Sequence, residues 1–148
     1  MSQPQRFVLF PLGTQRFALP ASIVAELAQQ GKVQEFPQTS PLLCGVLLRR
    51  GVIIAVCDLA QLLVAPPRPP RKYFLIVWRQ LGAGREMLAI PVSGECELCS
   101  VAPAEPRGGL PGYVTALLAL PGETIEVLDL EKVLASTGRA VVNGGGAA

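Results

Sequence analysis

Residues 56–63 read VCDLAQLL, and residues 127–134 repeat this stretch as VLDLEKVL. A second, looser pair lies upstream, with FALPAS at residues 17–22 and LAIPVS at residues 88–93. Both pairs are offset by the same 71 positions. This spacing is too long for a solenoid repeat and too short for two large independent domains. The sequence therefore predicts two similar halves packed together, with function at their junction.

The composition is that of a globular protein with few charges. Half of the 148 residues are hydrophobic and 16% are charged, against about 25% in average proteins. A chain of this length buries a real core and, with so few charges, can keep apolar patches for partners. The net charge of +2 comes from scattered residues, so we expect no nucleic-acid partner.

Membrane insertion and secretion are not expected either. No apolar run reaches the ~18 residues that a membrane span needs. The apolar stretch near the N-terminus is also too short for a signal peptide. We therefore expect a cytoplasmic protein without direct membrane insertion.

The residue types present exclude much catalytic chemistry. The chain has no histidine, which rules out Ser-His-Asp and Cys-His nucleophiles and a phospho-accepting histidine. The acidic residues do not cluster. Asp58 and Asp129 each open a helical pattern, where an Asp carboxylate is typical of a helix N-cap. We predict no catalytic residue and no cofactor.

The four cysteines leave two interpretations open. Cys96 and Cys99 form a C-x-x-C, but Cys44 and Cys57 are too far apart to be a second one. On a strand, Cys96 and Cys99 would point to opposite faces, which suits neither zinc nor a redox pair. We predict four small hydrophobic side chains and no metal site, with zinc or redox chemistry as the alternative.

Short apolar segments separated by turn residues predict a mostly β protein. The expected strands cover residues 6–12, 16–19, 45–48, 52–57, 73–78, 86–92, 95–101, 113–120 and 124–128. Short helices are expected at residues 20–30, 59–64 and 130–136. The proline-rich residues 65–71 are interpreted as a linker between the halves, with a polyproline ligand for SH3 domains as the alternative.

Several of these segments together resemble the CheW-like domain family. The stretch from Gly45 to Leu59 is similar to the family signature, written roughly G-V-x-N-L-R-G-x-[IV]-[IV]-P-[IV]-[VI]-[DN]-L. The resemblance covers residues 6–136 and implies two SH3-like five-stranded β-barrels packed together with a few short helices. Barrel one would span about residues 6–64, barrel two about 71–128 and a closing helix about 129–136. Residues 137–148 would be a flexible tail.

This resemblance also implies a function. CheW-like proteins are non-enzymatic scaffolds of chemosensory, two-component signalling. They couple the cytoplasmic tips of methyl-accepting chemoreceptors to the regulatory domain of a CheA-type histidine kinase. Two other classes stay open, an adaptor in a pathway such as surface motility and a module that binds a small molecule or a metal.

The resemblance places a receptor groove between the two barrels. By alignment, the groove residues of this chain are Val8, Val24 and Leu27, with Glu95 facing them. Glu95 occupies a position that is usually apolar in the family. The alternative interpretation is that the three aliphatic residues belong to the core.

The resemblance places kinase docking at Val46, Leu48, Arg49, Arg50 and Gly51. Where the family has N-L-R-G, Leu48 replaces the asparagine and Arg49 replaces an apolar residue. We expect the Arg49 guanidinium either to stay solvated at the rim or to be buried without a partner, and a charge of this kind opposes docking. The sequence thus predicts a divergent member with weak or lost kinase docking, or else ordinary drift with docking intact.

Overall fold

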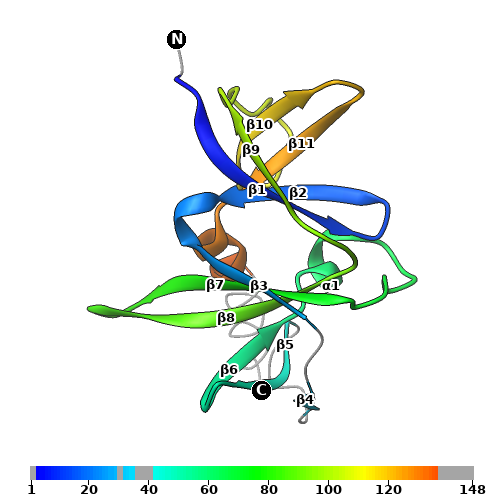
Figure 1. Ribbon diagram of the computed structural model, residues 1–148. Coiled ribbons are helices and arrows are strands. Elements are labelled where there is room, and N and C mark those ends of the chain that lie inside the picture. The colour runs from blue at the N-terminus through cyan, green and yellow to red at the C-terminus, as the bar shows by residue number, and fades with distance from the viewer. Residues whose placement is uncertain (1–2, 30–31, 36–41, 137–148) are drawn as a thin grey trace, which may run out of the picture.

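The computed structural model describes residues 3–29, 32–35 and 42–136, and these form two curved β-sheets stacked one above the other (Figure 1). The upper sheet has the strand order β10-β11-β2-β1-β9, and the lower sheet has the order β3-β7-β8-β6-β5-β4. The strands are β1 (Gln5–Leu12), β2 (Gln15–Pro20), β3 (Val24–Gln29), β4 (Val33–Glu35), β5 (Leu43–Arg49), β6 (Val52–Cys57), β7 (Tyr73–Leu81), β8 (Gly84–Val92), β9 (Glu97–Val101), β10 (Val114–Leu120) and β11 (Glu123–Leu128). The mostly β prediction is confirmed.

Three short helical segments complete the described chain. They are the 3-10 turn η1 (Ala21–Ile23), the helix α1 (Ala60–Leu63) and a helix over residues 130–136. The prediction of a helix over residues 20–30 is wrong, because η1 gives way at once to β3. Val24 and Leu27 looked like helical spacing, but the strand contains a bulge between Val24 and Glu26 that changes its alternation. No helix in the described part of the chain is long and apolar enough to cross a membrane.

The sheets do not follow the two halves of the sequence. The β1–β2 hairpin of the first half joins β9, β10 and β11, whereas the β7–β8 hairpin of the second half joins β3 to β6. The expected barrels of residues 6–64 and 71–128 are therefore not the structural units, because the halves exchange their hairpins. The lower sheet also has six strands rather than five, since β4 extends it. The expected tail at residues 137–148 lies outside the described residues.

The exchange is symmetric down to single residues. In the lower sheet Ala55 of β6 pairs in parallel with Leu88 of β8, and in the upper sheet Glu126 of β11 pairs in parallel with Phe17 of β2. Each residue of one pair lies 71 positions from its counterpart in the other. The repeat in the sequence is thus a repeat in the strand register.

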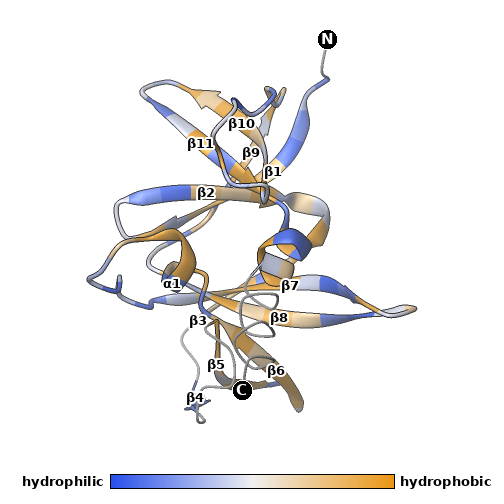
Figure 2. Cartoon of the chain, turned by 180° about the vertical axis from the view of Figure 1, so that it is seen from behind, coloured by the Kyte–Doolittle hydropathy of each residue, from blue (hydrophilic) through white to orange (hydrophobic). Residues whose placement is uncertain are grey.

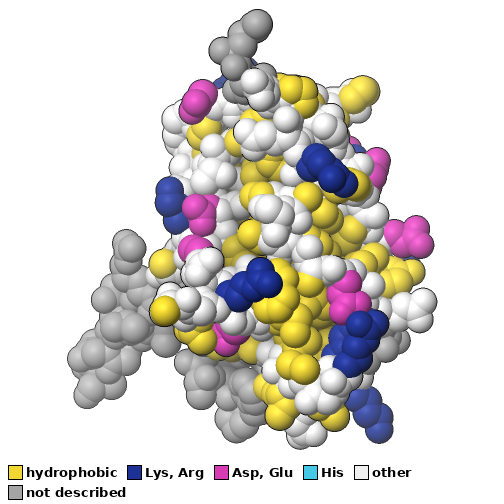
Figure 3. Space-filling view, turned by 60° about the vertical axis from the view of Figure 1, so that its left-hand side comes forward, with side chains coloured by type: hydrophobic (Ala, Val, Ile, Leu, Met, Phe, Trp, Pro, Cys, Tyr) yellow, Lys and Arg dark blue, Asp and Glu magenta, His cyan; other side chains and the backbone are white. Residues whose placement is uncertain are grey.

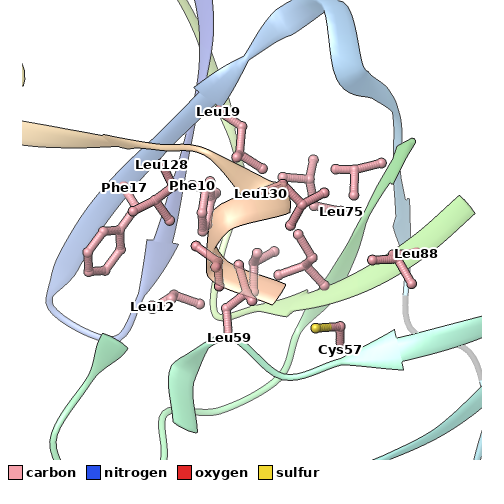
Figure 4. Packing of buried hydrophobic residues seen from close by; sticks show 14 of the residues in the cluster. Phe10, Leu12, Phe17, Leu19, Cys57, Leu59, Leu75, Leu88, Leu128 and Leu130 are labelled. Atoms are coloured by element: carbon pink, nitrogen blue, oxygen red, sulfur yellow. The ribbon is translucent and has the colours of Figure 1, made fainter. Parts of the chain in front are cut away.

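Each sheet encloses its own small core, and a larger core lies between them. The lower core contains Ala28, Leu47, Ile54, Val56, Phe74, Ile76 and Ala89. The upper core contains Phe7, Leu9, Ala18, Leu118, Ile125 and Val127. In the shared core, side chains such as Phe10, Leu75 and Leu88 gather around Leu130 of the helix over residues 130–136 (Figure 4). Burial of these aliphatic groups, at about 25 cal/mol per Å² of apolar surface, holds the sheets together.

The linker of residues 65–72 runs from α1 to β7 and packs on residues of both halves. Its Lys72 N–H donates to the Val92 carbonyl at 2.9 Å. Its Arg71 guanidinium lies 2.8 Å from the Asp58 carboxylate, which is 1% exposed. Both predicted caps are also present, because Asp58 accepts from the Ala60 N–H and Asp129 from the Lys132 N–H. The linker is therefore part of the packed structure.

Candidate protein-interaction surfaces

Three of the four predicted groove residues pack against the shared core between the sheets. Val8 of β1 belongs to the upper sheet, and Val24 and Leu27 of β3 belong to the lower sheet. All three are half-buried, and all three pack against the shared core. They lie on different sheets, and the shared core between the sheets is what they have in common. Their packing on the shared core agrees with the core interpretation, and the groove interpretation stays a prediction.

The fourth predicted residue lies outside this core. Glu95 is exposed and lies in the turn before β9 rather than in the strand. Cys96 packs on the shared core, and Leu98 is 56% exposed directly opposite Val8 in the β1–β9 pairing. Directly paired residues project to the same face of a sheet. Val8, Val24, Leu27, Cys96 and Leu98 are called the inter-barrel surface below.

Sequence reasoning missed Leu98, although a signal for it was present. Leu98 lies 71 positions after Leu27, so the repeat places it at the equivalent point of the second half. The resemblance instead placed Glu95 opposite Val8, Val24 and Leu27. Only the strand register shows that Leu98 lies beside Val8.

The predicted docking residues lie on the β5–β6 hairpin, at the far end of the lower sheet (Figure 1). Val46 pairs with Ala55, and Leu48 pairs with Ile53. Leu48 is 68% exposed and Ile53 is 70% exposed. These four residues, which share the outer face of the hairpin, are called the hairpin surface below. Both strands are hydrophobic over most of their length (Figure 2), so an apolar patch reaches the end of the molecule.

Arg50 and Gly51 form the two-residue turn of this hairpin. Their φ angles are 51° and 76°, both in the left-handed region. Two successive positive φ values are typical of the type I′ turn, which matches the twist of an antiparallel pair. Gly51 suits this backbone at no steric cost, whereas Arg50 accepts a mild one. The Arg50 side chain is 77% exposed and lies 3.9 Å from Glu26.

Arg49 takes neither of the two expected environments. Its side chain points to the inner face of the hairpin, away from Leu48, and forms two hydrogen bonds with Glu26 of β3. The distances are 2.7 Å from Nη2 to Oε1 and 3.2 Å from Nε to Oε2. β3 and β5 lie toward opposite edges of the lower sheet. The Arg49–Glu26 ion pair therefore connects two strands that are not neighbours, across the inside of the curved sheet. The expectation of an unpaired charge at the docking face is wrong, because successive side chains on a strand alternate and Glu26 neutralises the arginine.

This ion pair makes the stability of the lower sheet sensitive to acid. The hydrogen bond from Arg49 lowers the pKa of the Glu26 carboxyl. Its stabilisation is therefore complete above the unfolded pKa, about 4.3, and is lost as the pH falls through the lower folded pKa. We expect wild type to melt slightly above Glu26→Gln at pH 6, with the gap closing near pH 3. The effect is small, because both side chains are partly exposed. A gap independent of pH would contradict the assignment.

The cysteines pack as apolar side chains. Cys57 is buried, and burial raises its pKa to about 12 and that of Cys96 to about 11. Cys96 packs on the shared core and Cys99 on the upper core, so they face opposite sides as predicted. All four thiols are free. Thiols with such high pKa values are poor nucleophiles at neutral pH.

One face of the molecule gathers apolar side chains into a band with charged groups along its borders (Figure 3). This view turns the left-hand side of Figure 1, with η1 and the β7–β8 hairpin, toward the reader. A monomeric protein rarely leaves such a band without a use. The described residues therefore offer apolar surface for protein partners on more than one side.

Comparison with known proteins identifies the relatives of this arrangement. The family model of the CheW-like domain matches residues 6–137. The protein named chemotaxis protein CheW from Klebsiella aerogenes is 25% identical over 146 residues, covering 94% of this chain and 87% of that protein.

A solved structure has a similar fold. The crystal structure of the scaffolding protein TtCheW from Thermoanaerobacter tengcongensis superposes with a TM-score of 0.74 at 21% identity. The match covers 88% of this chain and 92% of that one. At this identity the likeness concerns the fold, and it extends to both sheets because nearly all of each chain is matched.

Proposed function

This chain belongs to the CheW-like domain family, and on that premise we propose that it couples chemoreceptor cytoplasmic tips to a CheA-type histidine kinase. It acts as a non-enzymatic scaffold in the cytoplasm. The observation that most supports this proposal is the presence of two separate apolar surfaces on one molecule. The inter-barrel surface lies at the junction of the sheets, and the hairpin surface lies at the end of the lower sheet.

The inter-barrel surface suits a helical partner. Its aliphatic side chains come from two sheets and line the junction, with Leu98 projecting from one side and Leu27 supplying the other. Recognition of a helix by a groove depends on a few apolar anchors spaced along one helix face. Receptor tips are helical hairpins, so we assign this surface to the receptor.

The hairpin surface suits a second protein domain. Leu48 and Ile53 form an exposed aliphatic pair, and Val46 and Ala55 continue the same face along the hairpin. Because Arg49 is held by Glu26 on the opposite face, its charge does not have to be desolvated when a partner covers Leu48. This geometry favours a docking surface that is retained over one that is lost. We therefore assign it to the regulatory domain of the kinase.

The proposal is tested by measuring the two partners separately. Isothermal titration calorimetry of the purified protein with a receptor tip fragment, and then with a CheA-type regulatory domain, should give micromolar or tighter binding for each. Both partners should also bind together, since the surfaces are distinct. Binding to the receptor alone would support an accessory adaptor that does not recruit the kinase. Binding to neither would reject the coupling function.

A substitution on the hairpin surface should separate the two activities. We expect Ile53→Asp to weaken binding to the regulatory domain about tenfold or more, on the order of 1.4 kcal/mol, by placing a carboxylate in an apolar contact. Receptor binding should stay within about twofold. Because Ile53 is 70% exposed, the variant should fold normally, and Leu81→Asp, at 54% exposure, is the matched control. Equal loss in both variants would remove the hairpin surface from the docking model.

A further inference from the structure

The two halves of the chain end in equivalent corners, one at Asp58 and one at Asp129. The Asp58 N–H donates to the Leu42 carbonyl at 2.9 Å, and the Asp129 N–H donates to the Tyr113 carbonyl at 2.8 Å. In both corners the carboxylate also caps the helix that follows. Each pair of counterparts is separated by 71 positions. The two corners therefore share one backbone contact, and in each the carboxylate accepts an N–H of the first helical turn.

The first corner is filled by the linker. Arg71 donates to Asp58 at 2.8 Å, and Arg68 lies 3.8 Å from the same carboxylate oxygen. Arg71 also lies 3.9 Å from the Cys44 sulfur. Pro69 of the linker lies close to Gly13 in the turn of the β1–β2 hairpin. A Cβ atom added to Gly13 would lie 3.4 Å from the Cβ of Pro69. An extended segment with two arginines and several prolines thus covers this corner.

The second corner is an open cavity of about 370 Å³. It is lined by Thr115 and Asp129, the counterparts of Cys44 and Asp58, and by Trp78 from the β7–β8 hairpin. The helix over residues 130–136 and η1 form its remaining walls. Within the described residues, no arginine lies on the Asp129 carboxylate as Arg71 lies on Asp58. Two of its lining residues are thus the counterparts of two residues that contact the linker in the first half.

The arginines of the cavity lie close to carboxylates or to an aromatic ring. Arg79 lies between Glu86 at 3.8 Å and Glu131 at 3.9 Å. The Arg85 guanidinium stacks over the Trp78 ring, 4.0 Å from its centroid. None of the described residues forms a hydrogen bond with the Arg79 Nε, so an anion is the competing occupant. The capping carboxylate is the acidic group of the cavity that could accept a new cation, and the apolar side chains beside it suit proline.

We propose that this cavity docks an extended, arginine-bearing segment of a partner protein, with chemistry like that of the linker. Its guanidinium pairs with Asp129 as Arg71 pairs with Asp58, and its apolar residues lie against Trp78 and Ile23. A charge-assisted hydrogen bond supplies specificity, and a proline-rich segment loses little entropy on binding because it is already extended. The site shares no residue with the inter-barrel or hairpin surfaces, so the proposal does not depend on coupling of receptor to kinase.

Trp78 is the single tryptophan of the chain and lies in the cavity, so it reports occupancy directly. The probe is a peptide with the linker sequence, Ala-Pro-Pro-Arg-Pro-Pro-Arg-Lys, titrated into the full-length protein while Trp78 emission is recorded. We expect a saturable change. Replacing both peptide arginines by alanine should weaken binding at least about tenfold, as should Asp129→Asn in the protein, because the ion pair is lost. Asparagine still caps the helix, so this variant stays folded.

The matched control is Glu35→Gln, which removes an exposed carboxylate from β4 and should leave the titration unchanged. Several results would overturn the proposal. One is no emission change up to millimolar peptide. Another is equal binding by the arginine-free peptide or by Asp129→Asn. Preferential binding of a peptide in which glutamate replaces arginine would assign the cavity to an acidic ligand of Arg79. Tighter binding of a peptide of residues 137–143 would assign it to this chain's own C-terminal segment.

Discussion

Replacing Asp58 by alanine will lower the free energy of unfolding by about 3–5 kcal/mol, whereas Asp129→Ala will lower it by about 1 kcal/mol. Both aspartates cap a helix, and both donate the same backbone hydrogen bond. They differ in their surroundings. The Asp58 side chain is 2% exposed and holds Arg71 at 2.8 Å, so its removal leaves a half-buried guanidinium without its carboxylate. The Asp129→Ala variant loses only the helix cap.

Urea denaturation followed by circular dichroism measures both values, and the repeat makes each variant the control for the other. Asp58→Asn separates cap from charge, since asparagine keeps the cap and removes the ion pair. In the double variant Asp58→Asn with Arg71→Met, much of the loss should be recovered, because methionine removes the charge that the Asp58 carboxylate had neutralised. Equal costs for the two alanine variants would show that the Asp58–Arg71 pair contributes nothing to stability.

The contrast between these aspartates shows how far the sequence can be interpreted. The caps were predictable, because an aspartate before a helical apolar pattern has one common local role. The ion pair was not, because Arg71 lies 13 positions away in a proline-rich segment without periodicity. Such a segment carries no information about which surface it packs on.

The fold was predictable in its elements but not in its pairing. Alternating apolar residues identify the buried face of each strand, and the repeat identified the two halves. This pattern does not tell whether β2 pairs with β6 or with β11. The two strands are equivalent in the repeat, and Val56 and Val127 are the same residue type at the same position. The tertiary structure alone decides that the hairpins are exchanged.

The candidate sites likewise include residues that could be placed from the sequence and residues that could not. Val8, Val24 and Leu27 could be placed near one another by resemblance, and the structure brings them to one core. The role of Arg49 could not be predicted, because its partner Glu26 lies on β3, a strand that is not adjacent to β5 in the lower sheet. A pattern written along one strand does not record which side chains meet across a curved sheet.

The largest effect on binding is expected at the inter-barrel surface. Leu98→Asp should weaken binding to a receptor tip about thirtyfold, since an apolar anchor in such a surface contributes about 2 kcal/mol. Leu98 is 56% exposed, so a carboxylate there stays hydrated in the free protein and is desolvated only when a helix covers it. Leu27→Asp should weaken binding at least as strongly, but Leu27 also packs on the shared core and its loss costs stability.

Leu81→Asp is the matched control for Leu98, because Leu81 has a similar exposure of 54% but lies at the tip of the β7–β8 hairpin. Calorimetry with the receptor tip should show full affinity for Leu81→Asp and loss for Leu98→Asp, with equal melting temperatures. Binding to the kinase regulatory domain should be unchanged in both. If Leu27→Asp unfolds the protein while Leu98→Asp binds normally, these leucines are core and edge residues, and the receptor must be recognised elsewhere. If Leu98→Asp alone loses binding in a folded protein, the partner helix contacts β9 as well as β3, and the receptor site spans both sheets.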